Sequence, residues 1–267
     1  MLSILKSALN ANTKEMGIVS NNIANVNSTA FKKSKTNFEH IYSRDRSSSP
    51  SKFSGQGVGV SDPLLQMSQG SLKTTNGALD LAITGLGFFT VVHEETLETP
   101  FFTRDGSFNI SATGEVITND GLKVMGYLGE DNQVLKNIVI PPNKINEDET
   151  TSMLSNINVN TSGKITATYG FDDEVVIGNF ILASFPNETG LRQIGNNRYE
   201  INSKSGLPNF GFPMDGAFGK IESGNLERSN VDITSEMITM LKAQQAFSGV
   251  SRLLQTEVDI TKRLIDG

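Results

Sequence analysis

The side chains that could do acid–base or metal chemistry are few and scattered along the chain. His40 and His93 are its two histidines, and cysteine is absent. A zinc site would therefore need carboxylates to complete it, because histidine and cysteine are the usual zinc ligands in proteins. Asp172 and Asp173 could serve as a general acid and base, as in a secreted hydrolase. Their spacing does not place them across a cleft, so we expect no metal, no cofactor and no enzyme.

Two further patterns resemble binding sites only superficially. Gly55, Gly57 and Gly59 form a glycine-rich stretch, but no Lys-Ser or Lys-Thr follows it, as a phosphate-binding loop requires. We interpret these glycines as turn residues. The lysine run 32–35 is typical of a solvated helix end rather than of a membrane or nucleic-acid patch.

Composition limits the partners. The chain has 267 residues, with 23 Lys and Arg against 29 Asp and Glu, and a net charge of −6. This balance disfavours nucleic acid, which is bound mainly through cationic side chains. The sequence contains no run of about 20 apolar residues, as a membrane span would require. Its N-terminus lacks the pattern of a cleavable signal peptide. We therefore expect no membrane insertion.

Apolar residues recur along the N-terminal segment at alternating spacings of three and four residues. This repeat predicts a helix within residues 1–36 whose narrow apolar stripe packs on long partner helices. Asn12 occupies one position of the stripe, where a buried polar residue tends to fix the alignment of two helices. The other positions are candidate assembly contacts: Leu2, Leu5, Leu9, Met16, Val19, Ile23 and Val26.

The C-terminal segment carries a second stripe with the same spacing. It predicts a helix within residues 225–267 that begins after the capping residue Asp232. More apolar residues lie outside the stripe than a single helix–helix contact would cover, so this helix needs further neighbours. The apolar positions of the stripe are candidate assembly contacts: Ile233, Met237, Met240, Phe247, Leu254, Val258 and Ile265.

The middle of the chain changes to short β-like runs separated by turn residues. We predict an extended linker over 37–75 and a β-rich outer domain over 76–224. Strands are expected near 79–83, 87–92, 101–103, 107–110, 115–118, 134–140, 175–185 and 198–201. Turns such as Asp105-Gly106 and Asp120-Gly121 should supply the positive φ that tight turns need. The predicted class is α+β: a discontinuous coiled-coil domain of terminal helices plus a β-rich middle domain.

Several runs resemble the bacterial flagellar rod and hook protein family, over nearly the whole chain. The run 21–33 (NNIANVNSTAFKK) resembles the family's N-terminal signature, and 70–72, 79–83, 85–89, 102–108 and 224–232 match in order. The positions taken as the family motif are Asn21, Asn22, Ala24, Asn25, Phe31, Lys32, Ser229, Asn230 and Val231.

The resemblance implies a structural subunit of the flagellar axial tube. Such a subunit would be exported by the flagellar type III apparatus without a cleaved signal, and would polymerise with itself and with other rod and hook proteins. Its terminal helices would form an inner coiled-coil layer, and its place would be the basal-body rod that spans the periplasm.

The sequence also allows other positions in the flagellum and other classes of protein. The size favours a rod subunit over a hook subunit with a large inserted outer domain, and the distal rod is favoured. A proximal rod subunit or a short hook subunit is kept because 217–220 leading into 226–227 resembles hook proteins. An adhesin-like binding module with oligomerising helices, or the secreted hydrolase, would belong to other classes.

Overall fold

The computed structural model describes residues 1–44, 53–93, 96–128, 135–145, 151–170 and 173–266. The chain has α+β architecture and divides into two compact units. The helical unit comprises Met1–Asn27, Lys32–Gln66 and Val231–Gly267, and the β unit comprises Ser28–Phe31 and Met67–Asn230. Segments from both ends of the sequence therefore belong to the same unit.

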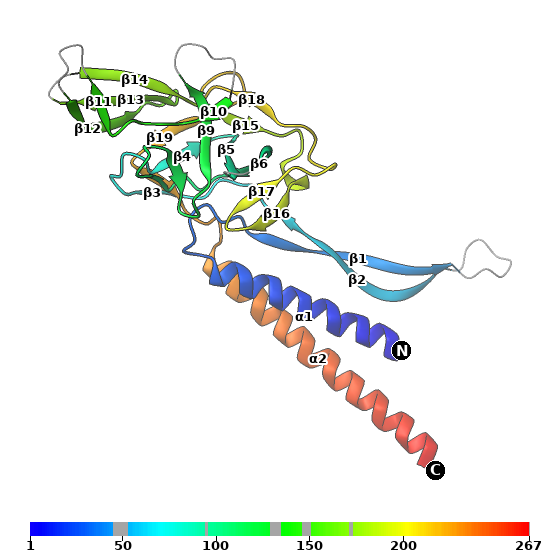
Figure 1. Cartoon of the computed structure of the whole chain (residues 1–267). Helices are drawn as coiled ribbons and strands as arrows, with labels where there is room; N and C mark the ends of the chain where they lie inside the picture. Colours follow the sequence, from blue (N-terminus) through cyan, green and yellow to red (C-terminus); the bar gives the residue numbers. More distant parts are fainter. Residues whose placement is uncertain (45–52, 94–95, 129–134, 146–150, 171–172, 267) are drawn as a thin grey trace. The chain divides into compact units, whose positions relative to one another are not determined.

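The helical unit contains α1 (Leu2–Ala24) and α2 (Ile233–Asp266). The two helices lie side by side and run in opposite directions (Figure 1). α1 is shorter than the predicted segment 1–36, because the chain leaves the helix after Ala24 and enters a strand at Ser34.

A two-stranded ribbon completes the helical unit. β1 (Ser34–Arg44) pairs antiparallel with β2 (Phe53–Leu65), and both strands contact α1. The segment interpreted as a linker is thus extended, but it is paired and belongs to the helical unit. Gly57 lies within β2 rather than in a turn. Its φ is +108°, and a Cβ there would lie 2.2 Å from Ser7 Oγ, so glycine allows α1 to approach the strand closely.

The β unit is built from short strands and one 3₁₀ turn, η1 (Glu188–Gly190). The strands are β3 (Leu72–Thr74), β4 (Leu81–Thr84), β5 (Phe88–His93), β6 (Thr96–Thr103), β7 (Phe108–Ile110), β8 (Val116–Thr118), β9 (Lys123–Leu128), β10 (Leu135–Asn137), β11 (Asn143–Ile145), β12 (Thr151–Val159), β13 (Lys164–Tyr169), β14 (Asp173–Phe180), β15 (Leu182–Ser184), β16 (Arg192–Gly195), β17 (Arg198–Glu200), β18 (Asn209–Gly211), β19 (Lys220–Ser223) and β20 (Asn225–Glu227).

Most of these strands join one antiparallel sheet. Its main path runs β11-β12-β13-β14-β9-β5-β6-β17-β16, and β10, β8 and β15 branch from β9 and β5. Two short pairs, β4 with β19 and β3 with β20, link segments far apart in the sequence. These pairs hold the two ends of the β unit's sequence together.

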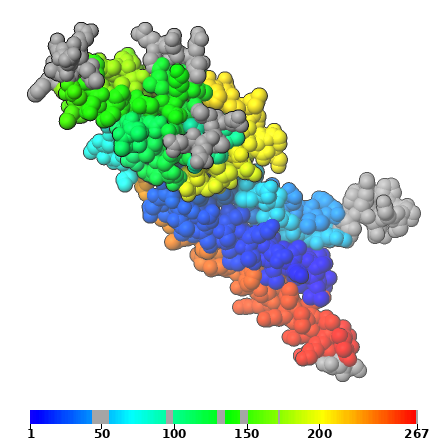
Figure 2. All heavy atoms as spheres, in the orientation of Figure 1, coloured from blue at the N-terminus to red at the C-terminus, as the bar shows by residue number. Residues whose placement is uncertain are grey.

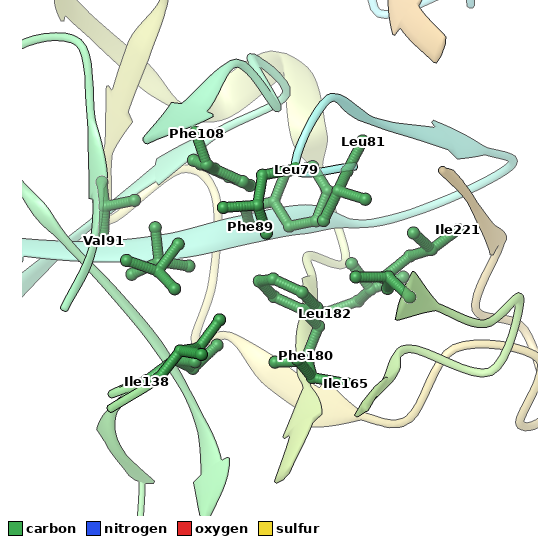
Figure 3. Close-up of a cluster of buried hydrophobic side chains, with 14 of the residues drawn as sticks. Leu79, Leu81, Phe89, Val91, Phe108, Ile138, Ile165, Phe180, Leu182 and Ile221 are labelled. Carbon is green, nitrogen blue, oxygen red and sulfur yellow. The ribbon is translucent and has the colours of Figure 1, made fainter. Parts of the chain in front are cut away.

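Alternation along β5 creates two aromatic clusters. Phe89 faces the main core, where its ring lies 5.1 Å from that of Phe108 (Figure 3). Phe88 points the other way and packs edge-on against Phe185 and Tyr199. Successive residues of a strand point to opposite faces, so β5 is buried on both. Most core residues are aliphatic or aromatic, as apolar burial requires.

The predicted turns form, but their glycines act in different ways. Gly121 has φ +81°, as expected for a tight turn. Gly106 was expected to supply a positive φ as well, and this is wrong: neither it nor Asp105 is among the positive-φ residues. A Cβ at Gly106 would lie 1.8 Å from the carbonyl oxygen of Leu81, so glycine is needed there for close backbone approach.

Candidate assembly interface

Asp232 begins α2 by capping its first turn. Its Oδ1 accepts a hydrogen bond from the backbone N–H of Thr234 at 2.9 Å. Its carbonyl oxygen accepts the N–H of Glu236 at 3.0 Å. The carboxylate also suits the positive end of the helix dipole. The predicted cap is confirmed.

Asparagine side chains determine where α1 ends. Asn25 Nδ2 turns back and donates to the carbonyl oxygen and to Oδ1 of Asn21, both at 2.9 Å. Asn22 bonds instead to the first residue of β1: its Oδ1 accepts the Ser34 N–H at 3.0 Å, and its Nδ2 donates to the Ser34 carbonyl at 2.8 Å. The amide thus pairs with Ser34 as a neighbouring strand would, which requires the chain to leave the helix before residue 34.

The start of α2 meets the same amide. Glu236 is buried, and its Oε2 accepts a hydrogen bond from Asn22 Nδ2 at 3.0 Å. Its Oε1 lies 3.7 Å from Lys33 Nζ. Lys32 is fully buried. The lysine run is therefore not the solvated helix end that we expected, since it lies past α1 and one of its members balances a buried carboxylate.

One face of α2 is buried or half-buried along most of its length. The two helices pack together, and these residues recur every three or four positions. They include Glu236, Met240, Ala243, Phe247, Val250, Leu254 and Glu257. Met240, Phe247 and Leu254 were among the candidate contacts, whereas Met237 and Val258 lie outside this face.

A second set of apolar residues on α2 stays exposed. Ile233, Met237 and Leu241 are spaced by four, so they form one row along the helix, which we call the exposed apolar row. Met237 is 52% exposed and Leu241 57%. A contiguous exposed apolar surface of this kind marks an interaction site more often than an accident of composition.

α2 also extends past its partner helix. Asn22 is level with Glu236, so at equal rise Leu2 is level with Thr256. Beyond that level every described side chain from Val258 onward is exposed, including Leu264 and Ile265 at 78% each. Figure 2 shows the red end of α2 projecting beyond the blue end of α1. We call residues 258–266 the overhang.

The candidate contacts on α1 are less exposed. Val19 is buried and Leu2 is exposed. The others are half-buried: Leu5, Leu9, Met16, Ile23 and Val26. Asn12, which was expected to fix helix alignment, is half-buried, and its side chain makes no hydrogen bond among the described residues. Asn22, which the predicted stripe does not include, is buried and bonded to Ser34 and Glu236.

The remaining motif residues have structural surroundings. In the β unit, Asn230 donates its N–H to the carbonyl of Phe31 at 3.3 Å, and its Nδ2 donates to the carbonyl of Ser68 at 3.0 Å. Phe31, Ser229 and Val231 are buried, whereas Asn21 and Ala24 are exposed. The signature therefore includes residues that hold the chain where it leaves and rejoins the terminal helices.

Two carboxylates of the β unit have local partners: Asp105, and Asp173, which was considered for catalysis. Asp105 borders a polar cleft of about 220 Å³ in the β unit, and its Oδ1 accepts hydrogen bonds from Ser107 N–H at 3.1 Å and Oγ at 2.7 Å. Burial raises the pKa of Asp105. Asp173 forms an ion pair with Lys144, and Asp172 lies outside the described residues. Within the described ranges, no cluster of three or more His, Cys, Asp or Glu could hold a metal.

No helix in the described part of the chain is long and apolar enough to cross a membrane.

Comparison with known proteins identifies the family. Residues 2–32 match the model of flagella basal body rod proteins, 82–167 the D1 domain of flagellar hook protein FlgE/F/G, and 222–266 the C-terminal region of flagellar basal body rod FlgEFG proteins. The helical termini and the start of the β unit thus each match a model from flagellar rod and hook proteins.

Two relatives that match over nearly their full length are both named flagellar basal-body rod protein FlgG. The chain is 32% identical to the flagellar basal-body rod protein FlgG of Buchnera aphidicola subsp. Baizongia pistaciae, covering 98% of this chain and 97% of that protein. It is 30% identical to FlgG of Bacillus subtilis, covering 94% and 92%. The flagellar hook protein FlgE of Helicobacter mustelae is 36% identical, but the match covers 57% of this chain and 36% of that protein.

The fold and the candidate interface define a class of protein. Its two termini form a helix pair with exposed apolar surface, and the middle of its sequence is β-rich. The chain belongs to the flagellar hook and basal-body rod protein family. This family consists of structural components of the flagellum.

Proposed function

We propose that this chain is a structural subunit of the flagellar basal-body rod, in its distal part. The observation that carries the proposal is the exposed apolar row together with the overhang, in a chain matched over nearly its full length by rod proteins. A subunit of a helical polymer needs unsatisfied surface of this kind, because every copy must bury it on a neighbour.

Neighbouring copies and other rod and hook proteins are the proposed partners of this surface. Burial of a half-exposed Met or Leu side chain contributes about 1 kcal/mol, so a few such residues per contact stabilise an assembly of many copies. In this arrangement α1 and α2 form an inner coiled-coil layer, and the candidate contacts on both helices are assembly contacts. Export would use the flagellar type III apparatus, without a cleaved signal.

The hook is a weaker alternative than the rod. The hook relative matches only 36% of its own length, whereas the rod relatives match at least 92% in the two comparisons above. A proximal position within the rod remains the second candidate, because the family models cover rod and hook proteins together.

A substitution on the exposed apolar row tests the proposal. Met237→Asp/Leu241→Asp adds two charges to side chains already half in water, so the isolated chain should keep its helical circular dichroism and unfolding midpoint. Buried on a neighbour, unpaired carboxylates are strongly unfavourable. Cells carrying this variant should fail to build a complete rod and should not swim.

The matched control is Gln245→Asp/Ser248→Asp, which adds the same charge to polar exposed positions of α2. This variant should support motility. Swimming cells with complete rods in the Met237→Asp/Leu241→Asp strain would overturn the proposal.

A further inference from the structure

Asn22 uses both its amide nitrogen and its amide oxygen in hydrogen bonds within the helical unit. It is 1% exposed. Its amide joins the end of α1 to the first residue of β1 through Ser34, and to the first turn of α2 through Glu236, at 2.8 to 3.0 Å. One side chain thus connects three elements of the unit.

Glu236 is held from two sides. Its Oε2 accepts a hydrogen bond from Asn22 Nδ2, and its Oε1 lies 3.7 Å from Nζ of Lys33. Lys33 directly precedes Ser34 in the sequence. A buried carboxylate needs hydrogen bonds or a countercharge to remain ionised. Asn22 and Lys33 therefore provide a site suited to a carboxylate on α2, and Ser34 holds Asn22 in place.

The apolar contacts of α2 do not specify one alignment of the two helices. Met240, Phe247 and Leu254 repeat at intervals of seven, so a slip of seven residues replaces Met240 by Phe247 and Phe247 by Leu254. Apolar side chains of similar volume are readily exchanged in a packed interface. Apolar burial alone would thus tolerate the slipped state.

The polar contacts discriminate against it. In the observed alignment Asn22 is level with Glu236, and a slip of seven brings it level with Ala243. Alanine offers no acceptor, so the amide would lose this bond and Glu236 would lose its partner in a buried site. The opposite slip brings Glu15 level with Glu236, which places two carboxylates together.

We infer that Asn22 and Glu236 are the positioning residues that fix the alignment of α1 against α2. Single buried polar residues set helix alignment in coiled coils at a cost in stability. The pair therefore also sets the position along α1 at which each side chain of α2 lies, including those of the exposed apolar row. The inference concerns the isolated chain and does not depend on the proposed rod function.

Cysteine cross-linking measures this alignment, because the chain has no cysteine of its own. Ala8 and Val250 are each 14 residues from the Asn22 and Glu236 pair, so they are level in the observed alignment. Ala8 and Glu257 are level only after the slip, which moves α1 by about 10 Å along α2. A short bismaleimide should join A8C to V250C, and should not join A8C to E257C.

The informative variant is Asn22→Leu/Glu236→Leu, measured in both cysteine backgrounds. The unfolding midpoint should fall, because the Ser34 N–H and carbonyl lose Asn22 and Lys33 loses Glu236. Cross-linking should then spread, with the A8C to E257C product rising at least several-fold. A stability role alone would lower the midpoint but would leave cross-linking with the A8C to V250C pair.

The matched control replaces two polar residues of the predicted stripes, Asn12→Leu/Gln244→Leu. It adds the same apolar volume, and cross-linking should stay with the A8C to V250C pair. If Asn22→Leu/Glu236→Leu does not fold, Asn22→Ala/Glu236→Ala takes its place, because alanine favours helix. Cross-linking confined to A8C and V250C in the folded variant would overturn the inference.

Discussion

At the residue scale, a buried ion pair joins two of the runs that resemble rod and hook proteins, 102–108 and 224–232. Arg104 and Glu227 lie in the β unit, are 2% and 0% exposed, and approach to 3.8 Å between Nη1 and Oε2. Arg104 Nη2 donates to the Gly85 carbonyl at 3.0 Å, and Glu227 Oε1 accepts the Gly70 N–H at 2.8 Å. The Arg104 guanidinium also lies over the Phe88 ring, at 5.0 Å. The pair ties loops around β3, β4 and β6 to β20.

Removing one charge of this pair should be costly. Arg104→Met removes a countercharge from the buried Glu227 carboxylate, and the free energy of unfolding of the β unit should fall by about 3 to 5 kcal/mol. Arg104→Met/Glu227→Gln keeps an acceptor for the Gly70 N–H and should recover most of the loss. Denaturant unfolding followed by tyrosine fluorescence measures both. A double variant as unstable as the single one would contradict this account.

Asp105 should make stability depend on pH. Its pKa is raised chiefly by burial, so the folded state binds its proton more tightly than the unfolded state. Stability from this group is therefore complete below the ordinary Asp pKa of about 4, and is lost as pH rises through the raised value. Asp105→Asn keeps an acceptor for Ser107 and should stabilise the chain at neutral pH.

The advantage of Asp105→Asn should disappear in acid. Unfolding midpoints of the variant and the parent chain, compared at neutral pH and below about pH 4, measure this. The same replacement at the exposed Asp215 is the control. An advantage of equal size at both pH values would show that charge burial is not the cause.

At the element scale, the start of α2 depends on one cap. Asp232→Ala removes the acceptor for the Thr234 N–H and should lower the stability of the helical unit by about 1 kcal/mol. Asp232→Ser retains an acceptor and should recover most of it. Thermal unfolding followed by helical circular dichroism measures the change, with Asp259→Ala, at an exposed position in the overhang, as the control. Equal effects at positions 232 and 259 would argue against capping.

Elements with a regular pattern and a local stop signal were predictable from sequence. The repeat that ends at Ile265 and the cap at Asp232 locate α2. β8 falls within the predicted run 115–118, and β5 exceeds the predicted run 87–92 by one residue, His93. β12 (Thr151–Val159) and β13 (Lys164–Tyr169) were missed because most of their residues are polar. Their pairing with each other and with β14 makes them strands.

The end of α1 and the pairing of β1 with β2 depend on contacts distant in sequence. The helical repeat continues to Val26, but Asn22 bonds Ser34 and the helix ends at Ala24. No pattern within the segment records that bond. For the same reason the repeat includes Asn12 but not Asn22, whose bonds reach Ser34 and Glu236, and it includes Met237, which lies outside the buried face of α2.

At the scale of the whole molecule, the two units differ in how completely they bury their apolar residues. The β unit buries a core of large apolar residues from strands throughout residues 79–221. The helical unit leaves Met237, Leu241 and the overhang in water. This contrast supports a subunit that keeps its own fold in the β unit and completes its apolar burial through its helices on assembly.

The central claim, a structural role in the distal rod, is tested most directly by electron microscopy of basal bodies from cells that lack this chain. The account predicts a shortened rod that carries no hook, restored to full length when the chain is supplied again. A complete rod without a hook, or an intact flagellum, would contradict it.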